Sequence, residues 1–314
     1  TIASLKGTAV LASWANTDTG TAVVNNTGTI IGAASLDTTS SNASHIVRNS
    51  GTMDGDIFLG NGEDRYEGAG GLIVGTVDGG AFADTLGGGD HPDSFDGGSG
   101  DDVLLGRGGD DDLVGGSGND FILGGAGNDE IAGGNNDDTI NANAGDDSLD
   151  GEGGNDVLVG QDGSDLLLGG DGRDTMDGGG GDDTLEGGDG NDILRGRNGE
   201  DDLAGGLGMD LLTGGEGADR FVFRGAAETA VGANRDQIID FEQGRDTIIV
   251  SGLSPGVFEF KGTGAFDTAT PNPELRLFET LTGSTIVQMD TDGDGTQDAE
   301  IRVGGVTGLT ADDF

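Results

Sequence analysis

The chain has 314 residues, of which 59 are acidic and 14 basic, giving a formal net charge of −45. Such a charge does not suit nucleic acid, whose phosphates bind Lys and Arg, and the lack of cysteine excludes disulfides and thiolate chemistry. No apolar run approaches the roughly 18 residues of a membrane-spanning helix. High charge with low hydrophobicity is typical of disordered chains. This chain is strictly periodic, however, and a disordered chain has no need of a regular repeat, so the periodicity argues against disorder.

Residues 1–78 carry a loose repeat of about 20–23 residues. The nearly duplicate segments VNNTGTIIG, from Val24, and VRNSGTMDG, from Val47, show it most clearly. Asn-x-Gly turns between short β-branched runs make this zone similar to the parallel β-helix of filamentous adhesin repeats. A Thr/Asn/Gly-rich linker is the alternative interpretation.

Residues 79–222 consist of a nine-residue unit repeated sixteen times without insertion or deletion. The sixth position is Asp in every unit, and the eighth is always Leu, Ile, Met or Phe. The first position is Gly except at Ala142, and the fourth is Gly except at Phe82, His91 and Asn136. Asn136 is the mildest departure, because Asn tolerates positive φ.

This GGxGxDxUx pattern resembles the RTX, or hemolysin-type calcium-binding, family. We expect positions 7–9 to form a three-residue strand with the eighth side chain inward, and positions 1–6 to form a tight glycine turn. Two units then make one coil of 18 residues. The predicted fold is all-β: a parallel β-solenoid, in which a β-helix leads into a calcium-binding β-roll, followed by a small antiparallel β domain.

The aspartates explain why such a chain needs a cation. Carboxylates one coil apart lie about 4.8 Å from each other and repel by roughly 0.9 kcal/mol per pair even in water. One buried aliphatic side chain per strand does not offset the entropy of ordering nine residues. Calcium fits between the turns because it takes six to eight oxygens in flexible geometry, whereas magnesium demands a stricter octahedron. The chain has no Cys or His set for transition metals.

The resemblance implies that sixth-position carboxylates and glycine carbonyls share each ion. The carboxylates are those of Asp102, Asp111, Asp120, Asp129, Asp138, Asp147, Asp156, Asp165, Asp174, Asp183, Asp192, Asp201, Asp210 and Asp219. The carbonyls are those of Gly98, Gly100, Gly116, Gly118, Gly125, Gly127, Gly170, Gly172, Gly179, Gly181, Gly188 and Gly190. Weaker ligation is expected at Asp84 and Asp93, where Phe82, His91 and Pro92 spoil the turn. We expect on the order of ten to fourteen calcium ions, bound as the chain folds.

Residues 223–314 lose the ninefold rhythm and show short alternating runs typical of antiparallel strands. These runs are DQIIDF (236–241), DTIIV (246–250), VFEF (257–260), ELRLF (274–278), TIVQM (285–289) and EIRVGG (300–305). The run DQIIDFEQGRDTIIVSGL resembles the carboxy-terminal region of serralysin-type secreted proteins. That resemblance implies a cap on the roll, at or next to an uncleaved type I secretion signal.

The segment DTDGDGTQDAE, residues 290–300, resembles the start of an EF-hand loop through Asp290, Asp292 and Asp294. The twelfth position is Ile301 instead of Glu, and β runs flank the segment where an EF-hand has helices. The alternatives are a calcium site and a plain Asp-Gly hairpin turn.

The outward seventh positions differ between the two faces of the roll. One face is apolar through Val103, Phe121, Val157, Ile193 and Leu211, while the other is mostly polar or charged. Ordinary β-propensity is one explanation. The other is that the apolar face packs against the carboxy-terminal domain or another subunit.

The sequence shows no catalytic constellation. HExxH and GxSxG motifs are absent, and the two histidines, His45 and His91, are expected in turns or at the surface. The chain begins at Thr1 without Met or a signal peptide, as a processed or excerpted protein would. We therefore expect a non-enzymatic, secreted or cell-surface bacterial protein exported by type I secretion, part of an adhesin, surface layer or matrix fibre. The alternative is the folding and secretion module of a larger enzyme or toxin.

Overall fold

The computed structural model describes residues 2–5, 8–10, 23–32, 34–35, 42–228, 231–251, 259–266 and 273–314. Within these ranges the regular elements are β-strands, apart from one 3-10 helix at Ala311–Asp313. The chain divides into two compact units, Thr1–Asp162 and Gly163–Phe314, which are described in turn.

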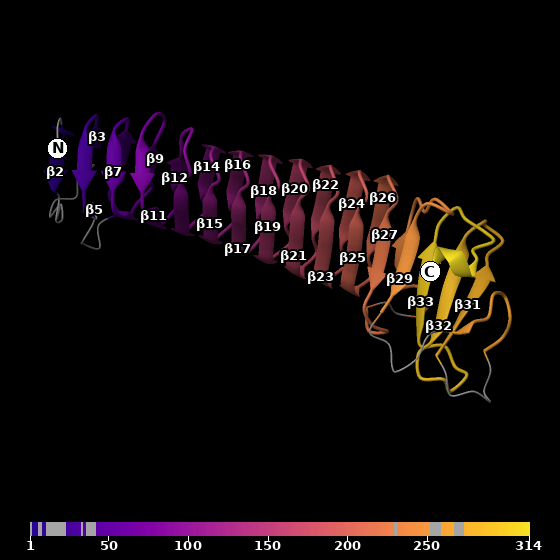
Figure 1. The fold of residues 1–314 in the computed structure, drawn as a ribbon. Helices are drawn as coiled ribbons and strands as arrows, with labels where there is room; N and C mark the ends of the chain where they lie inside the picture. The colour runs from indigo at the N-terminus through magenta and orange to yellow at the C-terminus, as the bar shows by residue number, and fades with distance from the viewer. Residues whose placement is uncertain are drawn as a thin grey trace. The chain divides into compact units, whose positions relative to one another are not determined.

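The first coils of unit 1 contribute strands to three parallel stacks, and neighbouring coils lie side by side (Figure 1). One stack contains β1 (Ile2–Leu5), β3 (Val23–Asn26), β6 (Ile46–Asn49), β9 (Arg65–Glu67) and β12 (Thr85–Gly87). The second contains β2 (Thr8–Val10), β4 (Thr29–Ile31), β7 (Thr52–Asp54) and β10 (Leu72–Val74). The third begins with β5 (Ala34–Ser35), β8 (Ile57–Asn61) and β11 (Thr76–Ala81).

The near-duplicate segments of the amino-terminal zone stack on each other residue for residue. Val24 pairs with Val47 and Thr29 with Thr52. The buried side chains of Asn26 and Asn49 join neighbouring coils through a hydrogen bond of 2.9 Å, in which Nδ2 of Asn26 donates to Oδ1 of Asn49. The predicted β-helix is confirmed, and the linker interpretation is wrong for these residues.

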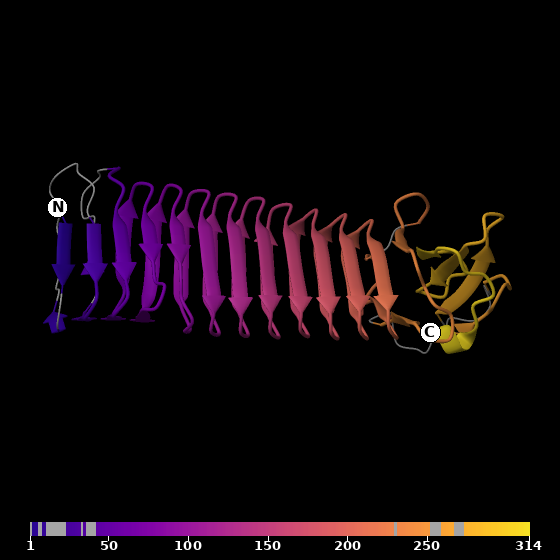
Figure 2. The same ribbon diagram turned by 90° about the horizontal axis from the view of Figure 1, so that it is seen from above.

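The rest of unit 1 has two strands per coil, in two parallel stacks. The strands of one stack lie side by side along the unit (Figure 2). One stack continues from β12 with β14 (Val103–Gly108), β16 (Phe121–Ala126), β18 (Thr139–Ala144) and β20 (Val157–Asp162). The other continues from β11 with β13 (Ser94–Ser99), β15 (Asp112–Ser117), β17 (Glu130–Asn135) and β19 (Ser148–Gly153). Val103 pairs with Phe121 and Phe121 with Thr139, which confirms the predicted coil of 18 residues.

The strands of the roll are longer than the three residues predicted. Most have six residues, because pairing continues through positions 1–3 of the next unit. Between β14 and β16 the register runs to Leu105 and Leu123 and resumes at Arg107 and Gly125. The interruption falls at the first position of the unit, here Gly106 and Gly124.

The eighth side chains form the core. From Leu86 to Phe221 every one of them is at most 2% exposed, and Leu104, Leu113 and Ile122 are fully buried. At the amino-terminal end of the ladder the rings of Tyr66 and Phe95 meet edge to face at 5.8 Å. The predicted ladder of one apolar residue per strand is confirmed.

Unit 2 repeats the two-stack arrangement. One stack contains β21 (Leu166–Gly172), β23 (Thr184–Gly190), β25 (Asp202–Gly208), β27 (Arg220–Phe223) and β29 (Thr247–Val250). The other contains β22 (Thr175–Gly180), β24 (Ile193–Asn198), β26 (Leu211–Glu216) and β28 (Asp236–Ile238). The antiparallel pairing predicted for β28 and β29 is wrong, because both are parallel additions to the solenoid.

The antiparallel set lies further along the chain, as β31 (Glu274–Glu279), β32 (Thr285–Asp290) and β33 (Ala299–Val303). β33 joins it to the solenoid by parallel pairing with β28, and β30 (Glu259–Phe260) pairs in parallel with β31. Of the predicted VFEF segment, residues 257–258 lie outside the described residues. One face of the set is buried, through Leu275, Leu277, Val287, Met289, Ile301 and Val303.

Candidate metal centre

The sixth-position aspartates are buried, and they link neighbouring coils. All sixteen are at most 5% exposed. One carboxylate oxygen, Oδ1, accepts the backbone N–H of the aspartate one coil earlier. Asp111 N lies 2.9 Å from Oδ1 of Asp129, and Asp129 N lies 2.7 Å from Oδ1 of Asp147. Each of these carboxylates therefore fixes the stacking of successive turns.

The second oxygen, Oδ2, points into a small cradle between the coils. In many of the units it is buried without a hydrogen-bond partner, as for Asp102, Asp111, Asp120, Asp129, Asp138, Asp183, Asp192, Asp201, Asp210 and Asp219. A Cβ built on Gly97 would lie 2.6 Å from Oδ2 of Asp102 and 2.6 Å from the carbonyl oxygen of Gly115, one coil ahead. A first-position glycine therefore leaves open the space that a carboxylate and a carbonyl oxygen both face.

One unit fills its own cradle. Ala142 stands at the first position and is fully buried. It carries the Cβ that Gly124 and the other first-position glycines lack. Its own carbonyl oxygen still faces the preceding coil, 2.9 Å from the Cβ position of Gly124. The unit of Asp147 therefore has less open space next to its carboxylate than the units that begin with glycine.

The predicted glycine ligands adopt the backbone conformation that turns carbonyls inward. All of them except Gly190 have positive φ, with 94° at Gly98 and 139° at Gly100 as examples. Asn136 has φ of 81°, as expected for a tolerated substitution, and Phe82 has φ of 79°. The carbonyl that meets Oδ2, however, belongs to the first position, which sequence reasoning did not single out.

The electrostatics of the turns oppose ionised carboxylates unless a cation is present. Burial raises the pKa of Asp102 to about 6 and the pKa values of Asp111 and Asp138 to about 7. Neighbouring aspartates add to this rise, and the backbone hydrogen bond to each carboxylate opposes it. A dication in the cradle removes the conflict, because it favours the charged form.

The two aspartates expected to be weaker differ from each other. Oδ1 of Asp84 accepts the backbone N–H of Asp64 at 2.6 Å, so Asp84 joins the regular ladder. Oδ2 of Asp93 is already engaged, because it accepts the backbone N–H of Gly89 at 2.8 Å.

The aspartate ladder extends beyond the nonapeptide array, which sequence reasoning missed. Oδ1 of Asp236 accepts the backbone N–H of Asp210 at 2.9 Å, and Oδ1 of Asp246 accepts that of Asp219 at 3.1 Å. Both new members are buried. Each begins an Asp-x-apolar triplet, DQI or DTI, and Asp64 begins another, DRY. That triplet was the available signal, but its spacing is no longer nine residues.

His45 is not a surface residue. It is 1% exposed, and both its backbone N and its ring Nδ1 face Oδ1 of Asp64, at 2.5 and 3.1 Å. The prediction was wrong because the β-helix places this segment inside a coil. His91 is exposed, as predicted.

The acidic segment of residues 290–300 connects β32 to β33, so it is a hairpin turn. Carboxylate oxygens of Asp290, Asp292 and Asp294 nevertheless lie within 4.8 Å of one another. The buried Asp290 already accepts the backbone N–H groups of Gly293 and Gly295, both at 2.8 Å. Metal binding at this turn stays a prediction.

The apolar outer face predicted from the seventh positions is present within unit 1. Phe121 is 41% exposed and Val157 is 40% exposed, while Val103 is half-buried. In unit 2, Ile193 pairs with Leu211 on the corresponding outer face, and both are half-buried.

The donor set identifies the kind of cation that fits. Carboxylate and carbonyl oxygens line the cradles, which suits a hard cation that accepts six to eight oxygens. Zinc and other transition metals prefer nitrogen or sulfur ligands, and the chain has no cysteine and only two histidines, His45 and His91. Among the described residues no helix is long and apolar enough to cross a membrane.

Comparisons with known proteins agree with this geometry. The model of the RTX calcium-binding nonapeptide repeat matches in overlapping segments that together cover residues 76–225. The AlgE6R3 subunit of the Azotobacter vinelandii mannuronan C5-epimerase is 29% identical, with 45% of this chain and 77% of that one covered and a TM-score of 0.34. The AlgE6R2 subunit is 32% identical, with coverages of 42% and 86% and a TM-score of 0.31.

A hyperactive, Ca²⁺-dependent, β-helical antifreeze protein from an Antarctic bacterium is 22% identical over 70% of this chain and 72% of its own, with a TM-score of 0.39. No curated protein matches the chain. The repeat pattern, the parallel coils and the family match lead to one conclusion: through residues 76–225 the chain belongs to the RTX family of calcium-binding nonapeptide repeat proteins.

Proposed function

We propose that the chain is a secreted structural protein whose roll folds when it binds extracellular calcium. One observation carries the proposal: in many units the sixth-position carboxylate is buried, with one oxygen hydrogen-bonded to the preceding coil and the other facing a carbonyl in an open cradle. A buried carboxylate that lacks a partner is strongly unfavourable. Calcium at the cradles supplies that partner, and binding and folding become one equilibrium.

The proposed ligands are Oδ2 of the aspartates from Asp102 to Asp219, together with Asp84, and carbonyl oxygens of the glycine turns. The first-position carbonyl joins this set because it faces the same space as Oδ2 of the preceding coil, as the carbonyl of Gly115 and Oδ2 of Asp102 both do beside Gly97. Two units are expected to bind weakly: the one at Asp93, whose Oδ2 is taken by Gly89, and the one whose cradle Ala142 fills. Ten to fourteen ions remain the expected number.

Extracellular calcium modules bind with Kd of about 10⁻⁴ to 10⁻³ M. The chain is thus expected to be unfolded and self-repelling at cytosolic calcium levels and rigid outside the cell. That behaviour suits export through a type I secretion channel. The three zones, residues 1–78, 79–222 and 223–314, would then be a β-helical extension, the calcium-dependent roll and a secretion-associated cap.

Far-UV circular dichroism with and without EGTA tests the proposal. We expect the β spectrum to be lost on chelation and restored by millimolar calcium, and isothermal titration calorimetry should count at least ten sites. A β spectrum that survives chelation would contradict calcium-dependent folding.

The role outside the cell is proposed to be structural, in an adhesin, surface layer or matrix fibre. The exposed side chains of Phe121 and Val157 on one outer face support self-association. Replacing both with Ser should abolish calcium-dependent oligomers in analytical ultracentrifugation, whereas replacing Asp112 and Glu130 on the other face should not. Oligomers that persist in the first variant would rule out this face, and a native chain that carries a catalytic domain would make the roll a folding module.

A further inference from the structure

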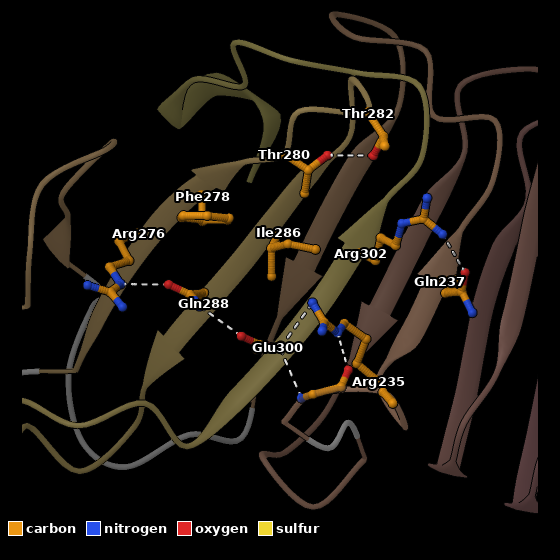
Figure 3. A pocket seen from close by; sticks show the side chains of 12 residues that line it. Arg235, Gln237, Arg276, Phe278, Thr280, Thr282, Ile286, Gln288, Glu300 and Arg302 are labelled. Atoms are coloured by element: carbon orange, nitrogen blue, oxygen red, sulfur yellow. Dashed lines mark hydrogen bonds and ion pairs between the residues drawn. The ribbon is translucent and has the colours of Figure 1, made fainter.

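The antiparallel set of unit 2 has a second face, opposite its buried one, that carries a hollow of about 670 Å³ (Figure 3). The volume lies within the range of small-molecule sites, about 300–1,000 Å³. The wall is formed by outward side chains of β31, β32, β33 and β28, which lie next to one another in the sheet. The hollow involves none of the sixth-position aspartates.

Strand register arranges these side chains in two rows. In the first row Arg276 pairs with Gln288, and Gln288 with Glu300. Hydrogen bonds run along it: Nε of Arg276 donates to Oε1 of Gln288 at 2.8 Å, and Nε2 of Gln288 donates to Oε1 of Glu300 at 2.7 Å. Arg235 ends the row with an ion pair to Glu300 at 3.1 Å.

The second row runs parallel to the first. Phe278 pairs with Ile286, Ile286 with Arg302, and Arg302 with Gln237. Nη1 of Arg302 donates to Oε1 of Gln237 at 2.9 Å, and the ring of Phe278 is 58% exposed. This row therefore places an uncovered aromatic ring and a guanidinium on the same wall.

The charge of the hollow is opposite to that of the chain. Three arginines and one glutamate line it, which leaves a net charge of +2 in a protein of net charge −45. Glu300 is paired with Arg235, whereas Arg276 and Arg302 donate to neutral amide oxygens. Arg276 is further held over the ring of Phe266, 4.3 Å from its centroid. Two fixed guanidinium groups thus keep their charge available for a ligand.

We propose that this hollow binds an acidic oligosaccharide of the uronate type. Guanidinium groups pair with carboxylates through two parallel hydrogen bonds. The amide of Gln237 and the hydroxyl oxygen of Thr282 suit sugar hydroxyls, and the exposed ring of Phe278 suits the flat apolar face of a sugar ring. An inorganic anion would use the charge and leave the ring and these polar groups unused. The repulsion by the rest of the chain is screened beyond about 8 Å at physiological salt.

Isothermal titration calorimetry on the full chain tests this, at 150 mM salt and 2 mM calcium. The probes are tetragalacturonate, the neutral sugar maltotetraose and the acidic peptide tetraglutamate. We expect only tetragalacturonate to bind measurably. Equal binding of maltotetraose or tetraglutamate, or no binding of tetragalacturonate, would overturn the proposal.

Variants distinguish uronate binding in the hollow from uronate binding at the acidic roll, where a calcium ion could bridge the protein and the sugar carboxylate. The double variant R276Q/R302Q should weaken binding at least tenfold, and Phe278→Ala at least threefold. Arg245→Gln is the matched control and should leave binding unchanged, because Arg245 pairs with Glu242 and does not line the hollow. Circular dichroism checks that each variant is folded. Tetragalacturonate binding that survives the double variant would place the sugar elsewhere and refute the site, whatever the outcome of the calcium tests.

Discussion

Replacing Asp129 with Asn separates the oxygen proposed to bind calcium, Oδ2, from the oxygen that accepts a hydrogen bond, Oδ1. The amide oxygen of Asn can still accept the backbone N–H of Asp111, which now lies 2.9 Å from Oδ1. The amide nitrogen takes the place of Oδ2, and its N–H groups can donate to the carbonyl of Ala142 on the wall of the same cradle. Asp129→Asn should therefore leave the packing of the turn intact and remove only the proposed calcium site.

The expected size of the effect follows from linkage. A ligand that binds only the folded state stabilises it by RT ln(1 + [L]/Kd). With Kd of about 10⁻⁴ to 10⁻³ M and calcium at about 10 mM, one lost site costs about 1.4–2.7 kcal/mol. For a chain of this size each kcal/mol lowers the unfolding midpoint by about 2–4 °C, so a fall of roughly 3–10 °C is expected.

Asp110→Asn is the matched control, because it removes the same charge from the same turn. Oδ1 of the exposed Asp110 accepts the backbone N–H of Asn128 at 2.9 Å, and an Asn there can do the same. Calorimetric stoichiometry and thermal unfolding at 10 mM calcium compare the two variants. If Asp129→Asn keeps the full stoichiometry and the midpoint of Asp110→Asn, Oδ2 does not bind calcium and the reasoning fails.

Three further predictions concern the cradle, the core and pH. Gly97→Ala places a Cβ 2.6 Å from Oδ2 of Asp102 and should remove one site, whereas Ala142→Gly should add one; calorimetric stoichiometries that do not move in opposite directions would contradict the cradle. Leu158→Ala, at a fully buried position, should cost about 2–5 kcal/mol in the calcium-bound state by thermal unfolding, and a cost below about 1 kcal/mol would contradict a packed ladder. Burial raises the pKa of Asp138 to about 7, so the folded ion-free chain binds more protons than the unfolded one. The stabilisation that comes from this proton uptake is complete below about pH 4 and is lost as the pH rises through about 7. Calcium-free protein should therefore regain β structure near pH 4 in circular dichroism, and a spectrum that does not change between pH 8 and pH 4 would refute this.

Periodicity together with the family resemblance was enough to predict the coils of the roll. The spacing of nine residues fixes which positions are equivalent, and the resemblance implies two units per coil, so Val103 was expected to pair with Phe121. The amino-terminal register could be predicted for the same reason, because duplicated segments place Val24 on Val47. In both zones, like residues stack on like.

Features that depend on local backbone geometry could not be predicted in this way. The Asp-x-apolar triplets at Asp236 and Asp246 continue the roll, but their spacing from the preceding aspartates is 26 and 27 residues instead of 18. Because loops are inserted between these triplets, a search with a fixed repeat length does not find them. The alternating apolar residues in these segments are also equally compatible with parallel and antiparallel strands. The burial of His45 was hidden for a similar reason, since a lone polar residue gives no sign of the coil around it.

The chain itself contains a comparison that explains why the sixth position is always Asp. The fifth position makes the same kind of hydrogen bond between coils, from a backbone N–H to a side-chain oxygen, and there the acceptor varies. It is Asp for Asp101 and Asp110, Asn for Asn128 and Ser for Ser164. A hydrogen bond between turns therefore does not require a carboxylate. The sixth position is Asp in all sixteen units. An amide or a hydroxyl group could accept the same hydrogen bond, but only a carboxylate also has a second anionic oxygen. That oxygen is the one buried in the cradle, so we expect the requirement for Asp to come from Oδ2 and from the calcium ion proposed to bind it.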